Sequence, residues 1–476
     1  MPDDTRLPRG KGFIQPAPKP LTLDEITAGD KGEKPLLLRD AGDVTPAPRL
    51  IPYDRYLDQK FVDLELEKIW KTQWQMACRE EDIPNVGDRT IYEVATLSFV
   101  VVRKGPNEFA AFYNSCRHRG RKLCTKKDSG GNVLRCPFHG WEYGLDGRLS
   151  YVPLNQEFPH VDAHSSSLVP VRVGTWGGHV FINPDPAATP LEDALGVLID
   201  HFKDFPLEDR QTAILIRLKI RANWKAAQEA FLEAYHTVET HADGMPILGS
   251  ASTQIDVWSK GRALVSRLYT PVAVVDDYIA KSVSPRDGLE LYCRMNDFDK
   301  PPKDRGHDLA DARLYAAERQ AKRLKKDTKR DFSNLPTSYL VDAPKYHMFP
   351  AFHPWWGEGI PWWYNFTPLG DDPDQCVMEI RILQPVPANG VRQPVPPAIT
   401  LEFGEEPDKH PILSKTFVGP ILAQDLRNME GVQQGFKAAA PGHRYMTVAR
   451  YQEAQITHFH EIYDRVMGLS VDRSAD

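Results

Sequence analysis

Two pairs of residues, each made of one cysteine and one histidine, carry the most specific chemistry in this chain. Cys116 and His118 lie in the run CRHRG, and Cys136 and His139 lie in the run CPFHGW. Two thiolates on one iron and two imidazoles on the other are the ligand set of one type of [2Fe-2S] cluster. The cysteine and the histidine of each pair must then reach different irons, so each pair has to project from a tight loop.

A structural zinc site is the competing interpretation, because two cysteines and two histidines also satisfy tetrahedral zinc. Zinc fingers place two cysteines before two histidines, whereas each half of this motif holds one of each. Gly120 and Gly140, just past the histidines, permit the backbone turns that two tight loops require. The spacing therefore favours the iron–sulfur cluster.

The motif CRHRG…CPFHGW closely resembles that of the Rieske proteins. In the Rieske proteins of the respiratory and photosynthetic cytochrome complexes, two further cysteines beside the ligands form a disulfide, and one of them lies between Cys and His of the second loop. Phe138 takes that place here, and the nearest cysteine after His118 is Cys124. The motif is therefore similar to those of oxygenase-type and ferredoxin-type Rieske domains, which differ in the length and content of the chain beyond the domain.

A second group of candidate ligands lies in NWKAAQEAFLEAYHTVETH, residues 223–241. We expect a helix over residues 226–236 that places Glu229, Glu233 and His236 near one face. On an ideal helix the imidazoles of His236 and His241 would point about 140° apart, so the helix should unwind or bend between them to bring both to one metal. Two imidazoles and one carboxylate on one face of an octahedron are typical of non-haem iron. Taken alone, this spacing fits ordinary surface or core histidines equally well.

After a Rieske motif, this run closely resembles the catalytic motif of the Rieske non-haem iron oxygenases. The resemblance assigns His236 and His241 to the two iron-ligating imidazoles. It assigns Glu233 to the acidic residue that links the two metal centres, a position that is often Asp and gains one methylene of reach here. The frequent asparagine of the family motif is Ala230 in this chain, so any role of that amide is absent.

The third iron ligand should be a carboxylate far downstream. The run GPILAQDLRNMEGVQQ resembles the family's C-terminal helix, in which an aspartate before Asn-Met-Glu ligates iron. The matching residue is Asp425, and Glu430, on a nearby face of the same helix, is the alternative. Without the motif, a lone helical aspartate is better explained as a solvated surface residue.

Patterning and resemblance together predict an α+β chain in three parts. Residues 1–48 are rich in Pro, Asp, Lys and Gly, and indicate an extended or partly disordered arm that is either solvated or packed on a neighbouring subunit. Residues 49–185 should form a helix and then an all-β Rieske [2Fe-2S] domain. Residues 186–476 should form a catalytic domain with a helix-flanked antiparallel sheet of the helix-grip type. Apolar patterning and turn signals place helices at 58–71 and 191–201, and strands at 90–94, 98–103, 109–113, 178–183 and 214–220.

Two segments of the predicted catalytic domain have unusual composition. Residues 301–332 combine alanines with clustered lysines and arginines and predict a basic helical insertion, either plainly solvated or a docking surface for an acidic electron carrier. Residues 346–366 hold four tryptophans, which core strands explain in part. The remainder could form the wall of a binding site for a flat substrate.

Composition excludes several classes of protein. The chain has 476 residues, 41% of them hydrophobic, and a net charge of −6, which gives no general attraction to nucleic acid or to anionic membranes. No run is long and apolar enough to span a bilayer, and the charged N-terminus lacks the apolar core of a signal peptide. Six widely spaced cysteines suggest no disulfide framework. We therefore expect a soluble, cytoplasmic protein.

The resemblance implies a terminal oxygenase α subunit. Electrons would pass from the [2Fe-2S] cluster to mononuclear Fe(II), where O2 is activated beside a small organic substrate. The family's head-to-tail homotrimer, with or without a β subunit, would place His139 of the partner subunit beside Glu233. The chain lacks a dinucleotide-binding fingerprint, so NAD(P)H would act indirectly, through a separate reductase with or without a ferredoxin.

Three functions remain open at this stage. The first is a dioxygenase that hydroxylates an aromatic or polycyclic ring, which the aromatic segment 346–366 favours mildly. The second is a monooxygenase or demethylase of a quaternary amine or a methoxy compound, whose cation could lie against tryptophan faces. The third is a pure electron carrier, which the long chain after the Rieske motif argues against. The sequence does not identify the substrate.

Overall fold

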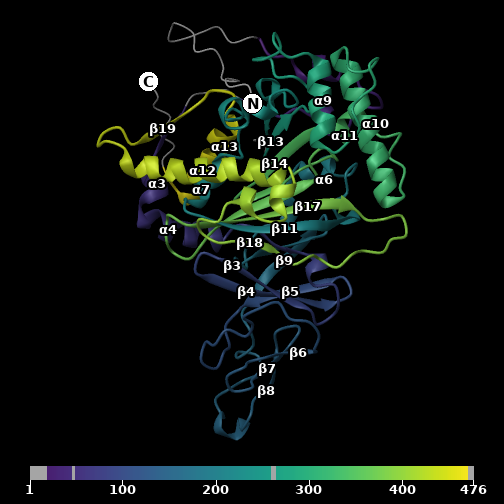
Figure 1. The fold of residues 1–476 in the computed structure, drawn as a ribbon. Coiled ribbons are helices and arrows are strands. Elements are labelled where there is room, and N and C mark those ends of the chain that lie inside the picture. Colours follow the sequence, from purple (N-terminus) through teal and green to yellow (C-terminus); the bar gives the residue numbers. More distant parts are fainter. Residues whose placement is uncertain (1–18, 45–48, 259–263, 470–476) are drawn as a thin grey trace.

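The computed structural model describes residues 19–44, 49–258 and 264–469 of the chain. Residues 49–183 build two antiparallel sheets, a six-stranded one of order β2-β10-β9-β5-β4-β3 and a three-stranded one of order β6-β7-β8 (Figure 1). Their strands are β2 Gln75–Arg79, β3 Arg89–Val94, β4 Leu97–Gly105, β5 Glu108–Tyr113, β6 Val133–Arg135, β7 Glu142–Gly144, β8 Leu149–Tyr151, β9 Pro170–Trp176 and β10 His179–Asn183. The strands predicted at 90–94, 98–103, 109–113 and 178–183 are β3, β4, β5 and β10, so these predictions are confirmed.

The second half of the chain forms a larger, eight-stranded sheet. Its order is β12-β13-β14-β15-β16-β17-β11-β18, antiparallel except where the edge strand β18 joins β11. The strands are β11 Arg210–Ile220, β12 Gln254–Val257, β13 Val265–Thr270, β14 Ala343–Met348, β15 Phe352–Pro354, β16 Trp362–Pro368, β17 Cys376–Pro385 and β18 Ile399–Leu401. An all-β module followed by a sheet with flanking helices confirms the predicted α+β class.

Helices flank this sheet and connect it to the first domain. They are α3 Asp54–Leu57, α4 Gln59–Glu65, α5 Leu191–Leu195, α6 Leu198–His201, α7 Trp224–Glu229, α8 Thr237–Thr240, α9 Pro285–Met295, α10 Leu309–Thr328, α11 Thr337–Val341, α12 Val418–Ala438 and α13 Ala454–Met467. The long helix α12 runs across one side of the sheet (Figure 1). The helix predicted at 58–71 is α4 followed by a π-helical turn, Leu66–Trp70. The helix predicted at 191–201 is split into α5 and α6 at Gly196, whose φ of +49° ends α5.

One apolar core crosses the boundary between the two domains. It contains Val101 and Ile182 of the six-stranded sheet together with Ile216 and Phe366 of the eight-stranded sheet, all fully buried. The short strand β1 (Arg49–Pro52) also pairs with β19 (Tyr445–Val448), so the C-terminal region returns to the start of the Rieske half. The two domains are thus held as one body. Within the part of the chain that the structure describes, no helix is long and apolar enough to cross a membrane.

The predicted N-terminal arm differs from the expectation wherever the structure describes it. Residues 19–44 form α1 (Leu23–Thr27) and α2 (Leu36–Arg39), which pack on the catalytic domain of the same chain. They are therefore neither an extended solvated arm nor a segment packed on a neighbouring subunit. Ile26 and Leu37 are buried there, although the arm has too few apolar residues for a core of its own. An ion pair also attaches the arm to the domain: the carboxylate of Asp30 lies 2.7 Å from the fully buried guanidinium of Arg313. Residues 1–18 and 45–48 lie outside the described residues.

The helix of the predicted basic insertion is confirmed, but the helix is not solvated on all sides. Residues 309–328 form the single helix α10, but one face of it is buried against α9 and α11, with Ala316 and Leu324 in the second apolar core. Lys322, Lys325 and Lys326 remain exposed on the other face. The segment is therefore an integral layer of the catalytic domain whose outer face alone is solvated.

The Asn-Trp-Lys run at the start of the catalytic motif has a structural explanation. Asn223 caps α7 by accepting a hydrogen bond from the backbone N–H of Lys225 at 3.1 Å. Trp224 donates its indole N–H to Glu65 at 2.7 Å, and the ammonium of Lys225 forms a buried ion pair with the same carboxylate. Tyr463 of α13 donates a third hydrogen bond to Glu65 at 2.7 Å. The run anchors α7 to the helices that precede the Rieske domain and that end the chain.

Replacing Lys225 with Met should lower the free energy of unfolding by about 3–5 kcal/mol, because Glu65 would remain buried and charged without its cation. Chemical unfolding followed by circular dichroism measures this change. Lys219→Met is the matched control, since Lys219 pairs with Glu402 at the surface and such pairs are worth about 1 kcal/mol or less. The double variant Lys225→Met with Glu65→Gln should recover much of the loss. Equal effects of the two lysine substitutions would contradict the anchoring role.

Candidate metal centres and substrate cavity

The two Cys-His loops have the turns that the sequence predicted. The backbone N–H of Gly120 donates to the carbonyl of Cys116 at 2.9 Å, and Gly140 donates to Cys136 at 3.0 Å. Gly120 and Gly140 have φ angles of +72° and +75°, in the left-handed region where a side chain would be strained. Both loops therefore turn back within five residues and present their cysteine and histidine side by side.

The four candidate cluster ligands lie together at the end of the Rieske domain. Cys116 and Cys136 are each only 3% exposed, and the rings of His118 and His139 lie 4.6 Å apart between centroids. His118 stacks on Trp141 at 5.0 Å, while His139 is exposed at the surface. The Nδ1 atom of His118 is buried and has no hydrogen-bond partner among the described residues. A buried ring nitrogen without a partner fits a metal ligand, so these residues suit an iron–sulfur cluster.

Tyr143 is a functional residue that the sequence reasoning missed. Its hydroxyl lies 3.3 Å from the Cys116 sulfur and accepts a hydrogen bond from the backbone N–H of Arg117 at 3.0 Å. Because the oxygen already accepts from Arg117, its own proton is free to be donated to the sulfur. Hydrogen bonds to cysteine sulfurs tune the potential of iron–sulfur clusters. Its place on β7, two residues after Trp141, was the only signal in the sequence.

Replacing Tyr143 with Phe should make the midpoint potential of the cluster more negative. The lost hydrogen bond is stronger to the reduced, more electron-rich cluster, and a difference of about 1 kcal/mol corresponds to roughly 40 mV for one electron. A redox titration followed by EPR measures the shift. Tyr151→Phe on the neighbouring strand β8 is the control, since Tyr151 is 52% exposed. An unchanged potential in Tyr143→Phe would show that the hydroxyl does not act on the cluster.

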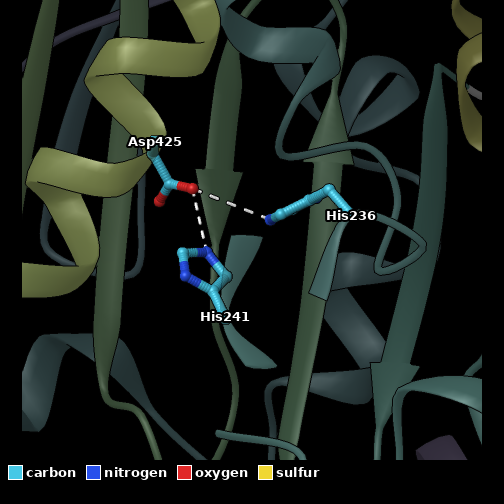
Figure 2. Close-up of side chains that lie close together, drawn as sticks. All are labelled: His236, His241 and Asp425. Atoms are coloured by element: carbon cyan, nitrogen blue, oxygen red, sulfur yellow. Dashed lines mark ion pairs between the residues drawn. The ribbon is translucent and has the colours of Figure 1, made fainter. Parts of the chain in front are cut away.

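A second candidate metal centre lies in the catalytic domain, where His236, His241 and Asp425 converge (Figure 2). One ligand atom from each lies within 4.8 Å of the others. Oδ1 of Asp425 is 2.9 Å from Nε2 of His241 and 3.7 Å from Nε2 of His236. Burial opposes a charged His241, but Asp425 and Gln424 outweigh it and raise the pKa of this imidazole. The site therefore favours positive charge, and two imidazoles with one carboxylate suit non-haem iron.

The local backbone reaches this geometry in a different way from the one predicted. The helix that begins at Trp224 ends at Glu229, and residues 230–236 are irregular, so the predicted helix over 226–236 is wrong beyond Glu229. The helix also does not unwind between the two histidines, because the short helix α8 lies between them. His236 and His241 flank α8 at its two ends, and His241 leaves the helical conformation with φ −115° and ψ 40°. A four-residue helix that ends at the non-helical His241 lets both imidazoles face Asp425.

Two further side chains orient the imidazoles. Glu233 accepts a hydrogen bond from the backbone N–H of His236 at 2.9 Å, and its other oxygen lies 2.6 Å from Nδ1 of His236. Gln424, which the sequence reasoning did not single out, lies 2.8 Å from Nδ1 of His241 through its amide oxygen. Both contacts direct the Nδ1 hydrogens outward and leave each Nε2 toward Asp425.

The alternative carboxylates do not join this cluster. Glu430, one turn beyond Asp425 on α12, accepts a hydrogen bond from the backbone N–H of Arg221 at 3.1 Å. Glu239, on α8, is exposed. The structure thus brings together His236, His241 and Asp425 with Glu233 behind them.

A cavity of about 1200 Å³ opens beside the histidine–aspartate cluster. Its walls are mainly apolar and aromatic, with Phe231, Trp355, Trp362, Tyr364 and Phe417 among them. The ring of Trp362 stacks on Phe417 at 5.8 Å.

The tryptophans of residues 346–366 divide between the two predicted roles, the wall of a binding site and the core. Trp355 and Trp362 line the cavity, whereas Trp356 and Trp363 are fully buried in the core.

Both domains of the chain match families of known proteins. The catalytic-domain model of the ring-hydroxylating α subunits matches residues 207–469, more than half of the chain, and the Rieske [2Fe-2S] domain model matches residues 73–166. The chain belongs to the ring-hydroxylating α-subunit family. The two matched domains imply a Rieske cluster and a mononuclear iron as the cofactors of this family member.

Curated relatives of known activity are similar over part of their length. The oxygenase subunit of carnitine monooxygenase from Escherichia coli K12 is 34% identical over 40% of this chain and 52% of its own length. The large subunit of anthranilate 1,2-dioxygenase from Acinetobacter baylyi is 33% identical over 40% of this chain and 42% of its own. The matches thus span about half the length of these relatives.

Solved structures share the fold over nearly the whole chain. A quaternary ammonium Rieske monooxygenase in complex with L-carnitine has a TM-score of 0.62 at 18% identity, covering 94% of this chain and 99% of its own. Naphthalene 1,2-dioxygenase with indole in its active site has a TM-score of 0.60 at 17% identity, covering 88% and 92%. These identities establish the architecture alone.

Proposed function

We propose that this chain is the oxygenase component of a Rieske system that hydroxylates an aromatic or polycyclic compound. The convergence of His236, His241 and Asp425 at the wall of a large aromatic cavity is the observation that carries this proposal. A ferrous ion held by these three residues would supply the activation of O2 in the reaction. An electron carrier without a catalytic centre would need neither the ligand set nor the cavity.

Each residue of the centre has a separate task. His236, His241 and Asp425 would hold the metal at the wall of the cavity. Glu233 and Gln424 hold the Nδ1 hydrogens of the two imidazoles and so fix the ring orientations. The apolar walls exclude water and position a flat substrate against Trp355 and Trp362.

Electrons should enter at the cluster and leave through its exposed ligand His139 toward the catalytic centre of another subunit. In Figure 1 the small sheet β6-β7-β8 lies at the bottom of the molecule, and the six-stranded sheet lies between it and the catalytic domain with α12, which carries Asp425. The family's head-to-tail homotrimer would bring His139 of the partner subunit to Glu233. A separate reductase, with or without a ferredoxin, would deliver the electrons. The six cysteines are all free, which suits a reducing compartment such as the cytoplasm.

The second candidate function is a monooxygenase or demethylase of a quaternary amine or a methoxy compound. The similarity to the carnitine monooxygenase subunit supports it. Product analysis separates the two candidates, since ring dihydroxylation gives a cis-diol and the alternative gives a single hydroxyl or a lost methyl group.

Iron and sulfide analysis with EPR on anaerobically purified protein tests the proposal. About three irons and two sulfides per chain are expected, two of the irons in the cluster. Two irons that Fe(II) reconstitution does not increase would overturn it in favour of an electron carrier.

Asp425→Ala should remove the mononuclear iron and abolish turnover while the visible spectrum of the cluster is retained, because the two centres use separate ligands. Metal analysis together with product formation measures both effects. Glu430→Ala is the matched control on the same helix and should keep all three irons. Loss of the cluster spectrum in Asp425→Ala would contradict the two-centre model.

Glu233→Gln should keep both metals and slow electron transfer between them by roughly tenfold or more, since a charge-assisted hydrogen bond becomes a weaker neutral one. Single-turnover oxidation of the reduced cluster, followed by its absorbance, gives the rate. Glu239→Gln, at an exposed carboxylate of the same region, should leave the rate unchanged. A full rate in Glu233→Gln would place the bridge elsewhere.

A further inference from the structure

A single lysine of the central sheet faces the cavity beside the catalytic centre. Lys345 lies in β14, opposite Leu268 of β13, and all six residues of β14 are buried. The lysine is only 2% exposed, yet it lines the cavity together with Ala343, two residues before it on the same face of the strand. A cationic side chain thus occupies a wall that is otherwise mainly apolar.

The ammonium of Lys345 has no hydrogen bond or ion pair to any residue of the described ranges. The nearest acidic groups are already engaged, since Glu233 contacts His236 and Asp425 contacts both imidazoles. Burial lowers the pKa of Lys345 to about 7, against the opposing charges of Glu233 and Asp425. A buried ammonium with three unused donors is costly unless an anion completes its surroundings.

The lining of the cavity supports an anionic rather than a cationic occupant. Lys281 and Arg294 also line it and are exposed, against one exposed carboxylate of the lining, Asp243, so the exposed charges of the lining are positive in sum and can attract an anion. A quaternary amine would have to approach the buried ammonium of Lys345 at close quarters in a medium of low polarity, where like charges repel strongly.

We propose that Lys345 binds a carboxylate of the substrate, which makes the substrate class an aromatic acid rather than an uncharged hydrocarbon or a quaternary amine. The ammonium receives the carboxylate while the ring system lies against Trp355, Trp362 and Tyr364. This inference rests on the proposed function for the identity of the cavity as the substrate site. Lys345 thereby selects the substrate and fixes which ring edge faces the metal ligands.

Matched probes that differ only in charge test the proposal by binding, without turnover. We would measure the Kd values of naphthalene-2-carboxylate and biphenyl-4-carboxylate, and of the corresponding carboxamides, for the metal-loaded protein by calorimetry. Wild type should prefer at least one acid over its amide by about 10- to 100-fold, as a charge-assisted hydrogen bond implies. Lys345→Met should remove this preference and leave amide binding within about threefold, because only the charge is lost.

Two control variants keep the test decisive. Lys345→Arg keeps a cation and should retain a preference for the acid, while Lys322→Met, at an exposed lysine of α10 outside the cavity lining, should change the preference by less than about threefold. Thermal unfolding checks that each variant is folded.

Equal affinity of wild type for acids and amides, or no binding of either, would overturn the proposal. So would an unchanged preference in Lys345→Met, or a change in its iron content alone, which would mean that the lysine only balances the charge of the metal ligands. Failure of the proposed function is distinguishable, because it appears in the iron content and products and not in the charge preference.

Discussion

The buried contact of Lys225 and Trp224 with Glu65 is the interaction on which the positions of the metal ligands depend. It fixes the start of α7, and the chain from the end of α7 to His241 contains only irregular backbone and one four-residue helix. The backbone hydrogen bonds of this segment join residues three or four apart, so its direction is set by where α7 ends and by contacts with α12. Since Glu65 also accepts from Tyr463, three segments far apart in the sequence converge on one carboxylate.

The Rieske domain and the catalytic domain are fixed relative to each other. The apolar core that joins the two sheets and the pairing of β1 with β19 hold the domains as one body, so the Rieske loops cannot swing toward α12. His139 is nevertheless exposed, and the small sheet that bears it projects away from the catalytic domain (Figure 1). A ligand that is exposed on a fixed projection is suited to contact another molecule. The geometry of one chain thus agrees with the proposed transfer of electrons to a second copy.

Much of the site could be predicted from sequence because its chemistry depends on residue types at short spacing. The two Cys-His loops need glycine at positive φ, and this requirement is visible at Gly120 and Gly140. The path of the chain around His236 could not be predicted, because periodicity continues through 226–236 while contacts elsewhere end the helix at Glu229. The contact from Gln424 to His241 and the one from Tyr143 to Cys116 join distant segments. No local pattern encodes them.

The docking of residues 19–44 was missed for a related reason. Composition indicates that a segment cannot form its own core, but it does not reveal a core supplied by the rest of the chain. Here α10 presents the fully buried Arg313, whose Nη1 and Nη2 donate to Asp342 of the same domain. Asp30 of the arm accepts from the remaining Nε and from Nη2, so the arm satisfies hydrogen-bond donors that the catalytic domain leaves open.

The buried cation beside the catalytic centre differs from Arg313 in the partners that the chain gives it. Glu233 and Asp425 together carry two negative charges, which a ferrous ion would offset. The ammonium of Lys345 is then left over in an apolar wall where screening by water is weak. In the arm the chain provides the missing hydrogen-bond acceptor itself. At Lys345 the described residues provide none, and the open volume lies on the side where an acceptor would bind. An uncompensated buried charge that faces a cavity is therefore better explained by what enters the cavity than by the fold.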